Sequence, residues 1–239
     1  MTATISIQGT PIQFLPRVEG FKALGVRITF DNKFDVELNA RFRAARATFH
    51  KFAPILECKA ISLEKRLAVL KRTVCPALFW CSGSWNLRKD QCAKLRGLQF
   101  SMVRKMIGPS RGDSESLEDF MIRTNSKIKH LLCHHDIDRW DYVSHRNVFK
   151  WGGWLARLSV HDPNRLTYRV FRHKDWNWIQ LSVAAFNKGR QLHCRRLHTW
   201  RWERPIFKAL GLDWHSLAAD KEEWEAQLDS LASWRCLHR

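Results

Sequence analysis

The chain has 239 residues, of which 45% are hydrophobic and 12% aromatic, so it can bury a substantial core and is not a disordered tail. Its formal net charge of +18 indicates anionic partners, with nucleic acid favoured over an anionic membrane surface. No apolar run approaches the roughly eighteen residues of a membrane-spanning helix, and the first residues do not resemble a signal peptide.

The first segment, residues 4–30, shows a pattern typical of short strands. Apolar side chains alternate there with other residues at a period of two: Ile5, Ile7, Ile12, Phe14, Val26, Ile28 and Phe30. Gly9-Thr10-Pro11 and Val18-Glu19-Gly20 interrupt this alternation. The segment therefore predicts two or three strands that form hairpins, as a small N-terminal β element within residues 1–34.

Residues 35–110 predict three basic amphipathic helices. Their apolar side chains recur at three- and four-residue spacing: Phe42, Ala45, Phe49 and Phe52, then Leu63, Leu67, Leu70 and Val74, then Cys92, Leu95, Met102 and Met106. Lysines and arginines take up much of the remaining circumference of each helix. Each helix can bury one face against the others and keep a cationic face in water, which suits the binding of a polyanion.

Local signals mark where these helices begin and end. Asp35 and Ser62 are expected N-caps of the first and second helices. Pro54 is expected at or just beyond the end of the first helix, and Cys75-Pro76 should kink or stop the second. The third helix should end at Gly108-Pro109.

Polar residues 110–116 are the best candidate linker, and a helical region follows over residues 116–239. Helices are expected from a cap at Ser116 to about residue 135, over 138–158, 163–171 and 205–210, and over 221–234 after a cap at Asp213. Gly152-Gly153 indicates a helix bend or close packing. The end of the chain is nearly neutral, so the positive excess lies upstream.

This C-terminal region is rich in tryptophan: Trp140, Trp151, Trp154, Trp176, Trp178, Trp200, Trp202, Trp214, Trp224 and Trp234. Such side chains either pack a core or stack on exposed bases. Core packing is favoured for Trp151, Trp154, Trp214 and Trp224. The sequence does not decide between these two roles for Trp200 and Trp202. Only Arg201 separates them, and residues 175–204 have little periodicity.

Several motifs together resemble one protein family. Phe21-Lys22-Ala23-Leu24-Gly25 followed by Ile28-Thr29 looks like an element that follows the catalytic palm in non-LTR (LINE-type) retrotransposon reverse transcriptases. Similar matches follow in the family's order: Ala44-Arg46-Ala47, Ile61-Ser62-Leu63, Val74-Cys75-Pro76-Ala77-Leu78, Gly83-Ser84-Trp85, Leu98 to Gly108, and Lys208 to Trp214. Ala23 and Ser84 depart from the family pattern, which has an aromatic and an acidic residue there.

The resemblance implies a primer-grip hairpin, a helical thumb and a C-terminal tail. It assigns the primer grip to Phe21, Lys22, Leu24 and Gly25. Phosphate-binding candidates in the thumb-like stretch are Arg41, Arg43, Arg46, Lys65, Arg66, Lys71, Arg72, Arg104 and Lys105. The implied partners are a DNA or RNA template–primer duplex and a separately encoded palm, with no membrane and no small-molecule cofactor, in the nucleus or cytoplasm.

Catalysis by this chain is not expected, because nucleotidyl transfer needs paired carboxylates for two metal ions and the sequence contains no Asp-Asp pair. The cluster Asp136, Asp138 and Asp141 matches no palm motif and is interpreted as a helix cap with solvated acids. The alternative function is that of a host-expressed interaction or structural protein derived from such an element, without a nucleic-acid role.

No metal site is predicted, although two clusters contain metal-ligating residue types: Cys133, His134 and His135, and His193, Cys194 and His198. Only the His193–His198 pair has a spacing typical of structural zinc. The seven cysteines are scattered singly and are expected to be reduced thiols in an intracellular compartment.

Overall fold

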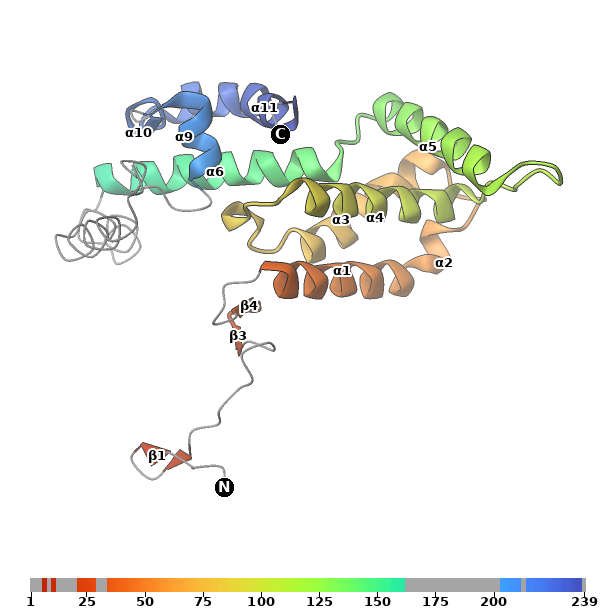
Figure 1. Cartoon of the computed structure of the whole chain (residues 1–239), viewed down its shortest axis with the longest axis horizontal. Coiled ribbons are helices and arrows are strands. Elements are labelled where there is room, and N and C mark those ends of the chain that lie inside the picture. Colours follow the sequence, from red (N-terminus) through yellow and green to blue (C-terminus); the bar gives the residue numbers. More distant parts are fainter. Residues whose placement is uncertain are drawn as a thin grey trace, which may run out of the picture. The chain divides into compact units, whose positions relative to one another are not determined.

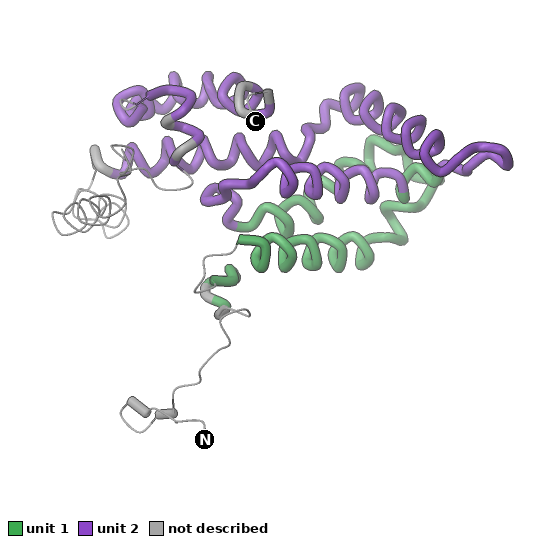
Figure 2. The backbone as a smooth tube through the Cα atoms, in the orientation of Figure 1, with its two compact units in different colours: residues 1–80, 105–108 green, residues 81–104, 109–239 purple. Residues whose placement is uncertain are grey.

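The computed structural model describes residues 6–7, 10–11, 21–28, 34–161, 203–211 and 214–237. In these ranges the chain is mainly helical with short strands near its N-terminus, which confirms the predicted fold class (Figure 1). Two compact units emerge: residues 1–80 with 105–108, and residues 81–104 with 109–239 (Figure 2). The three consecutive regions expected from the sequence stay a prediction.

Two short hairpins lie among the described residues of the first unit. Strand β1 (Ser6–Ile7) pairs antiparallel with β2 (Thr10–Pro11), and β3 (Phe21–Ala23) pairs antiparallel with β4 (Val26–Ile28). Between β3 and β4, Leu24 and Gly25 have φ values of 48° and 83°. Positive φ at both central residues is the signature of the tight turn that suits the twist of a two-residue hairpin. The other predicted strand positions, such as Ile12 and Phe30, lie outside the described residues.

The helices of the first unit are α1 (Phe34–Lys51), α2 (Ala53–Leu56) and α3 (Leu63–Leu78), and α1 packs along α3. The predicted apolar stripes are buried almost as expected, and the buried side chains are Leu38, Phe42, Ala45, Phe49, Leu56, Leu67, Leu70, Val74 and Leu78. Phe52 and Leu63 are only partly buried. Sequence periodicity therefore located this core.

Two predicted helix ends differ slightly from the structure. Helix α1 begins at Phe34, so Asp35 lies in its first turn, where a carboxylate interacts favourably with the helix dipole. Helix α3 continues through Pro76 to Leu78, and the Phe79 N–H closes its last turn on the Cys75 carbonyl at 2.8 Å, so Pro76 does not stop the helix where it stands. The Ser62 cap is confirmed, since its hydroxyl accepts from the Lys65 N–H at 3.5 Å.

The second unit is built from the short 3-10 helix η1 (Ser82–Ser84) and six α-helices in the described residues. These are α4 (Lys89–Ile107), α5 (Leu117–His134), α6 (Trp140–His161), α9 (Arg204–Leu210), α10 (Trp214–Leu217) and α11 (Lys221–Leu237). The last turn of α4 belongs to the first unit. Gly108 has φ 61° immediately after it, as expected for the predicted helix end.

Helices α6 and α11 pack together around a tryptophan-rich core, and both Trp214 and Trp224 are buried as predicted. Helix α6 continues through its glycine pair. A Cβ at Gly153 would lie 2.1 Å from Nε1 of Trp224, which donates to the Phe149 carbonyl at 3.0 Å. Close packing is therefore the role of Gly153.

The core assignment of Trp154 is wrong, because its side chain is 44% exposed. Residues 148, 149, 152, 153, 155 and 156 form the buried face of α6 around its tryptophan-rich part, and at about 100° per residue Trp154 lies opposite the middle of that face. Trp151 is partly buried against the core, as expected. The helix expected over 163–171, the cap at Asp213, and Trp176, Trp178, Trp200 and Trp202 lie outside the described residues.

Candidate nucleic-acid interface

Six of the predicted phosphate-binding side chains are exposed on the first unit. They lie on α1, on α3 and in the last turn of α4, and are Arg43, Arg46, Lys65, Lys71, Arg72 and Lys105. Their exposure follows from the amphipathic pattern, because the apolar stripes of α1 and α3 face each other and leave the cations in water. Most of the residues predicted from the sequence to bind phosphates therefore lie on the surface of one compact unit.

Arg66 does not belong to this surface, and its assignment as a phosphate ligand is corrected. Its side chain is buried, and its guanidinium donates to the carbonyls of Ile61 at 2.9 Å, Leu56 at 3.2 Å and Met106 at 2.6 Å. These carbonyls lie at the end of α2, in the loop before α3 and at the end of α4. Arg66 thus satisfies backbone acceptors that would otherwise be buried without a donor.

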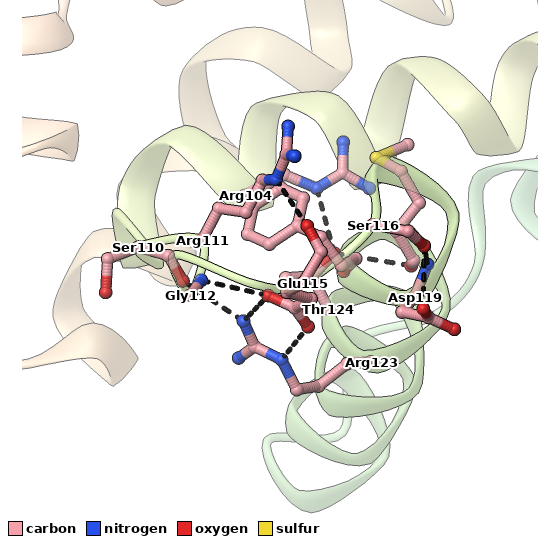
Figure 3. A network of polar contacts seen from close by, with 11 residues as sticks. Arg104, Ser110, Arg111, Gly112, Glu115, Ser116, Asp119, Arg123 and Thr124 are labelled. Atoms are coloured by element: carbon pink, nitrogen blue, oxygen red, sulfur yellow. Dashed lines mark hydrogen bonds and ion pairs between the residues drawn. The ribbon is translucent and has the colours of Figure 1, made fainter.

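Arg104 is also engaged within the protein, in the second unit. Its guanidinium donates to the Thr124 hydroxyl at 3.3 Å (Figure 3). It also donates to Oδ1 of Asn125 at 2.6 Å, so it holds α4 to α5. Because Arg104 is only partly exposed and its donors are directed at α5, it contributes to packing between these helices.

The β3–β4 hairpin, which carries the residues assigned to the primer grip, is fastened to α1 by Glu37. This carboxylate is 2% exposed at the residue level and accepts from the Arg27 backbone N–H at 2.6 Å and from Nε of Arg41 at 2.5 Å. Arg41 in turn donates to the Gly25 carbonyl. A carboxylate and a guanidinium that are both largely buried satisfy each other and fix the hairpin turn in place.

A cavity of about 360 Å³ lies beside this hairpin. It is lined by Lys22 of β3, Arg27 of β4, the α1 side chains Arg41 and Arg43, and Trp80 after α3. Lys22, Arg27 and Arg43 are exposed, whereas Arg41 is largely buried in its ion pair with Glu37. The cavity therefore combines a strongly positive lining with an aromatic ring.

Trp80 is half exposed, at 52%, yet its ring is held in place. Its indole N–H donates to the Leu24 carbonyl at 3.2 Å, and the ring lies against Gly25. A side chain at residue 25 would place its Cβ 3.1 Å from Nε1 of Trp80, so glycine suits both the close approach and the φ of 83° there.

Sequence analysis missed three members of this site: Arg27, Glu37 and Trp80. The i, i+4 spacing of Glu37 and Arg41 was a usable signal for an ion pair. Trp80 and Arg27 carried no such signal, because their proximity arises from a contact between the hairpin and the end of α3, distant in sequence. Among the assigned primer-grip residues, Leu24 and Gly25 form the turn and Lys22 lines the cavity.

The acidic cluster of the second unit is not arranged for metal binding. Asp141 is buried and is held by Arg96 at 3.2 Å and Arg139 at 2.8 Å, so its charge is neutralised by guanidinium groups. Within the part of the chain that the structure describes, no three histidine, cysteine or acidic side chains could jointly hold a metal ion. His193, Cys194 and His198 lie outside that part.

Comparison with known proteins gave no match to a family model, to a curated protein or to a solved structure. None of the helices in the described ranges combines the length and hydropathy that a bilayer crossing requires.

Proposed function

We propose that the chain binds a nucleic-acid duplex through its phosphates, using the exposed cations of the first unit. The observation that carries this proposal is the placement of Arg43, Arg46, Lys65, Lys71, Arg72 and Lys105 on the surface of one helical unit. The cationic cavity beside the hairpin adds Lys22 and Arg27 to the same unit. The net charge of +18 supports a polyanionic partner.

The finer proposal is that this duplex is a template–primer and that the chain acts as a thumb-like part of a reverse transcriptase whose palm is supplied elsewhere. Its support is the resemblance of residues 21–25 and 44–108 to the LINE-type pattern. The turn formed by Leu24 and Gly25 and its attachment to α1 through Glu37 fit a rigid hairpin that positions a strand. Chemistry would belong to the palm, and this chain would position the duplex.

The proposal predicts strongly salt-dependent and sequence-tolerant binding, because lysine and arginine contacts to phosphates release counterions and read no bases. Contact with about four to six phosphates gives a log-log salt slope of roughly −4 to −5 for B-form DNA. The measurement is a fluorescence-anisotropy titration of a labelled blunt duplex at several salt concentrations. A second duplex of unrelated sequence should give the same slope.

Two double variants of equal charge change test where the duplex binds. Lys71→Glu with Arg72→Glu, on exposed positions of α3, should weaken binding to every duplex and flatten the slope by about two. Lys208→Glu with Lys221→Glu, on exposed positions of α9 and α11, should weaken duplex binding much less. Salt-independent binding, or an equal loss of duplex affinity in the two double variants, would reject the duplex-binding surface. The alternative function, that of an interaction or structural protein, would then be favoured.

A further inference from the structure

We infer that the cavity beside Trp80 holds one unpaired nucleotide of the bound nucleic acid, an inference that rests on the proposed function. The base stacks on the Trp80 indole and its phosphate lies among the cations of the cavity. The preferred substrate class is therefore a duplex with a single-stranded extension, bound more tightly than a blunt one.

The charge of the cavity favours a phosphate. Lys22, Arg27, Arg41 and Arg43 line it, and its described lining contains no carboxylate. The nearby carboxylate of Glu37 is outside this lining and already accepts hydrogen bonds from the Arg27 N–H and from Arg41. The exposed heads of Lys22, Arg27 and Arg43 therefore act on whatever enters the cavity.

The Trp80 ring favours a base. Its N–H is satisfied by the Leu24 carbonyl and its position is fixed against Gly25, so about half of a large apolar surface is held in water in one orientation. A preorganised ring loses little conformational entropy when a ligand stacks on it. Stacking of a base on an aromatic side chain tolerates any sequence, since every base has a π-face.

The cations and the exposed Trp80 ring together indicate that the bound nucleotide is unpaired. Within a duplex the π-faces of the internal bases are covered by their neighbours, and a protein surface meets phosphates, sugars and base edges. An aromatic ring beside cations is therefore fully used only by a nucleotide that has left the stack. The volume of about 360 Å³ lies within the range of roughly 300–1,000 Å³ typical of small-molecule sites, so it suits one nucleotide and not a helix.

The experiment compares three labelled DNA ligands at one salt concentration: a blunt duplex, the same duplex with a three-nucleotide extension, and that duplex with an abasic extension. Both strand polarities are used. The natural extension should tighten binding roughly tenfold, from stacking of one base. The abasic extension carries the same phosphates without bases, so it should bring much less of this gain.

Three variants then assign the gain to the cavity. Trp80→Ala should abolish it, Trp80→Phe should keep part of it, and Trp154→Ala, which removes a comparably exposed tryptophan of the second unit, should keep all of it. Circular dichroism should be unchanged in each, because both side chains are half exposed.

Two results would overturn the inference while leaving the proposed function intact: salt-dependent binding of the blunt duplex with no gain from the extension, or a full gain in Trp80→Ala. Absence of binding to all three ligands would overturn both.

Discussion

Arg66 and Lys65 are neighbours in sequence with the same charge, yet they face different surroundings. Lys65 is exposed in the first turn of α3, whereas Arg66 is buried and donates to three backbone carbonyls. Sequence analysis assigned both to the phosphate-binding surface, because helical periodicity locates an apolar stripe but does not reveal backbone acceptors that converge on its border. Only the fold brings the ends of α2 and α4 to one guanidinium.

Replacing each residue with methionine separates the two roles. Arg66→Met keeps much of the apolar stem and leaves three carbonyls without their donor, so it should lower the free energy of unfolding by about 3 kcal/mol. Lys65→Met should change that free energy by less than about 0.5 kcal/mol. It should instead weaken duplex binding severalfold through loss of one phosphate contact.

Urea unfolding and duplex titration of both variants provide the measurement. Loss of stability in Lys65→Met equal to that in Arg66→Met would contradict the assignment of Arg66 to backbone capping. An unchanged duplex affinity in Lys65→Met would remove that side chain from the surface proposed for phosphates.

At the scale of elements, the segment expected to be a linker connects α4 to α5. Its glycine and polar composition predicted a connection, and the structure shows that this connection is a hydrogen-bonded turn (Figure 3). Arg123 donates to the Ser110 carbonyl at 3.1 Å and pairs with Glu115 at 2.7 Å, while Arg111 donates to the Glu115 carbonyl at 2.7 Å. Because Glu115 and Arg123 are eight residues apart, no local sequence pattern predicted this contact.

The start of α5 itself was predictable, because its signals are local. The Ser116 hydroxyl accepts from the Asp119 N–H at 3.0 Å, which confirms the expected cap. The cap fixes the helix start, and the Glu115–Arg123 pair then fixes the turn that precedes it. Elements with local signals were thus located, whereas the contacts that tie them together were not.

The stability contributed by the Glu115–Arg123 pair should depend on pH. The cause is the lowered pKa of Glu115 beside Arg123. Its hydrogen bonds lower the pKa of Glu115 from 4.5 to about 2. A carboxyl with a lowered folded-state pKa contributes stability above its unfolded pKa and loses that contribution as the pH falls through the folded value. The pair should therefore be intact above pH 4.5 and should be lost as the pH falls toward 2.

Carbon-detected NMR titration of the Glu115 carboxyl measures this midpoint directly. A midpoint near 2 is expected for the native chain, and Arg123→Ala should return it toward the ordinary value of a glutamate. Since the Arg123 side chain is exposed and Glu115 is partly exposed, added salt should weaken the effect. A native midpoint near 4.5 would mean that the ion pair does not form in solution.

At the scale of the whole molecule, hydrophobic periodicity and charge balance were sufficient to predict a mainly helical chain with a basic stretch. Periodicity could not reveal that the last turn of α4 belongs to the first unit, or that Arg41, Trp80 and the hairpin line one cavity. These features depend on contacts between residues up to 56 positions apart, such as Leu24 and Trp80. Among the exposed cations of the cavity, Lys22 and Arg43 were singled out from the sequence, whereas Arg27, the anchor Glu37 and the aromatic ring of Trp80 were missed.

Uneven placement of charge between the described elements leads to the last prediction. Helix α11 carries Glu222, Glu223, Glu225 and Asp229 against two basic residues, so it should repel a duplex that the first unit attracts. A ligand that binds only the native state protects the region whose opening it opposes.

Hydrogen exchange measured at low salt should localise that protection. A saturating blunt duplex should slow exchange in residues 34–80 and in the last turn of α4, while the exchange of α11 should stay nearly unchanged. High salt should erase the difference, because the contacts are electrostatic. The Lys71→Glu and Arg72→Glu double variant serves as the control, since its protection by the same duplex concentration should be much smaller. Protection centred on α6 and α11 would place the duplex on the second unit and reject the thumb-like assignment of the first.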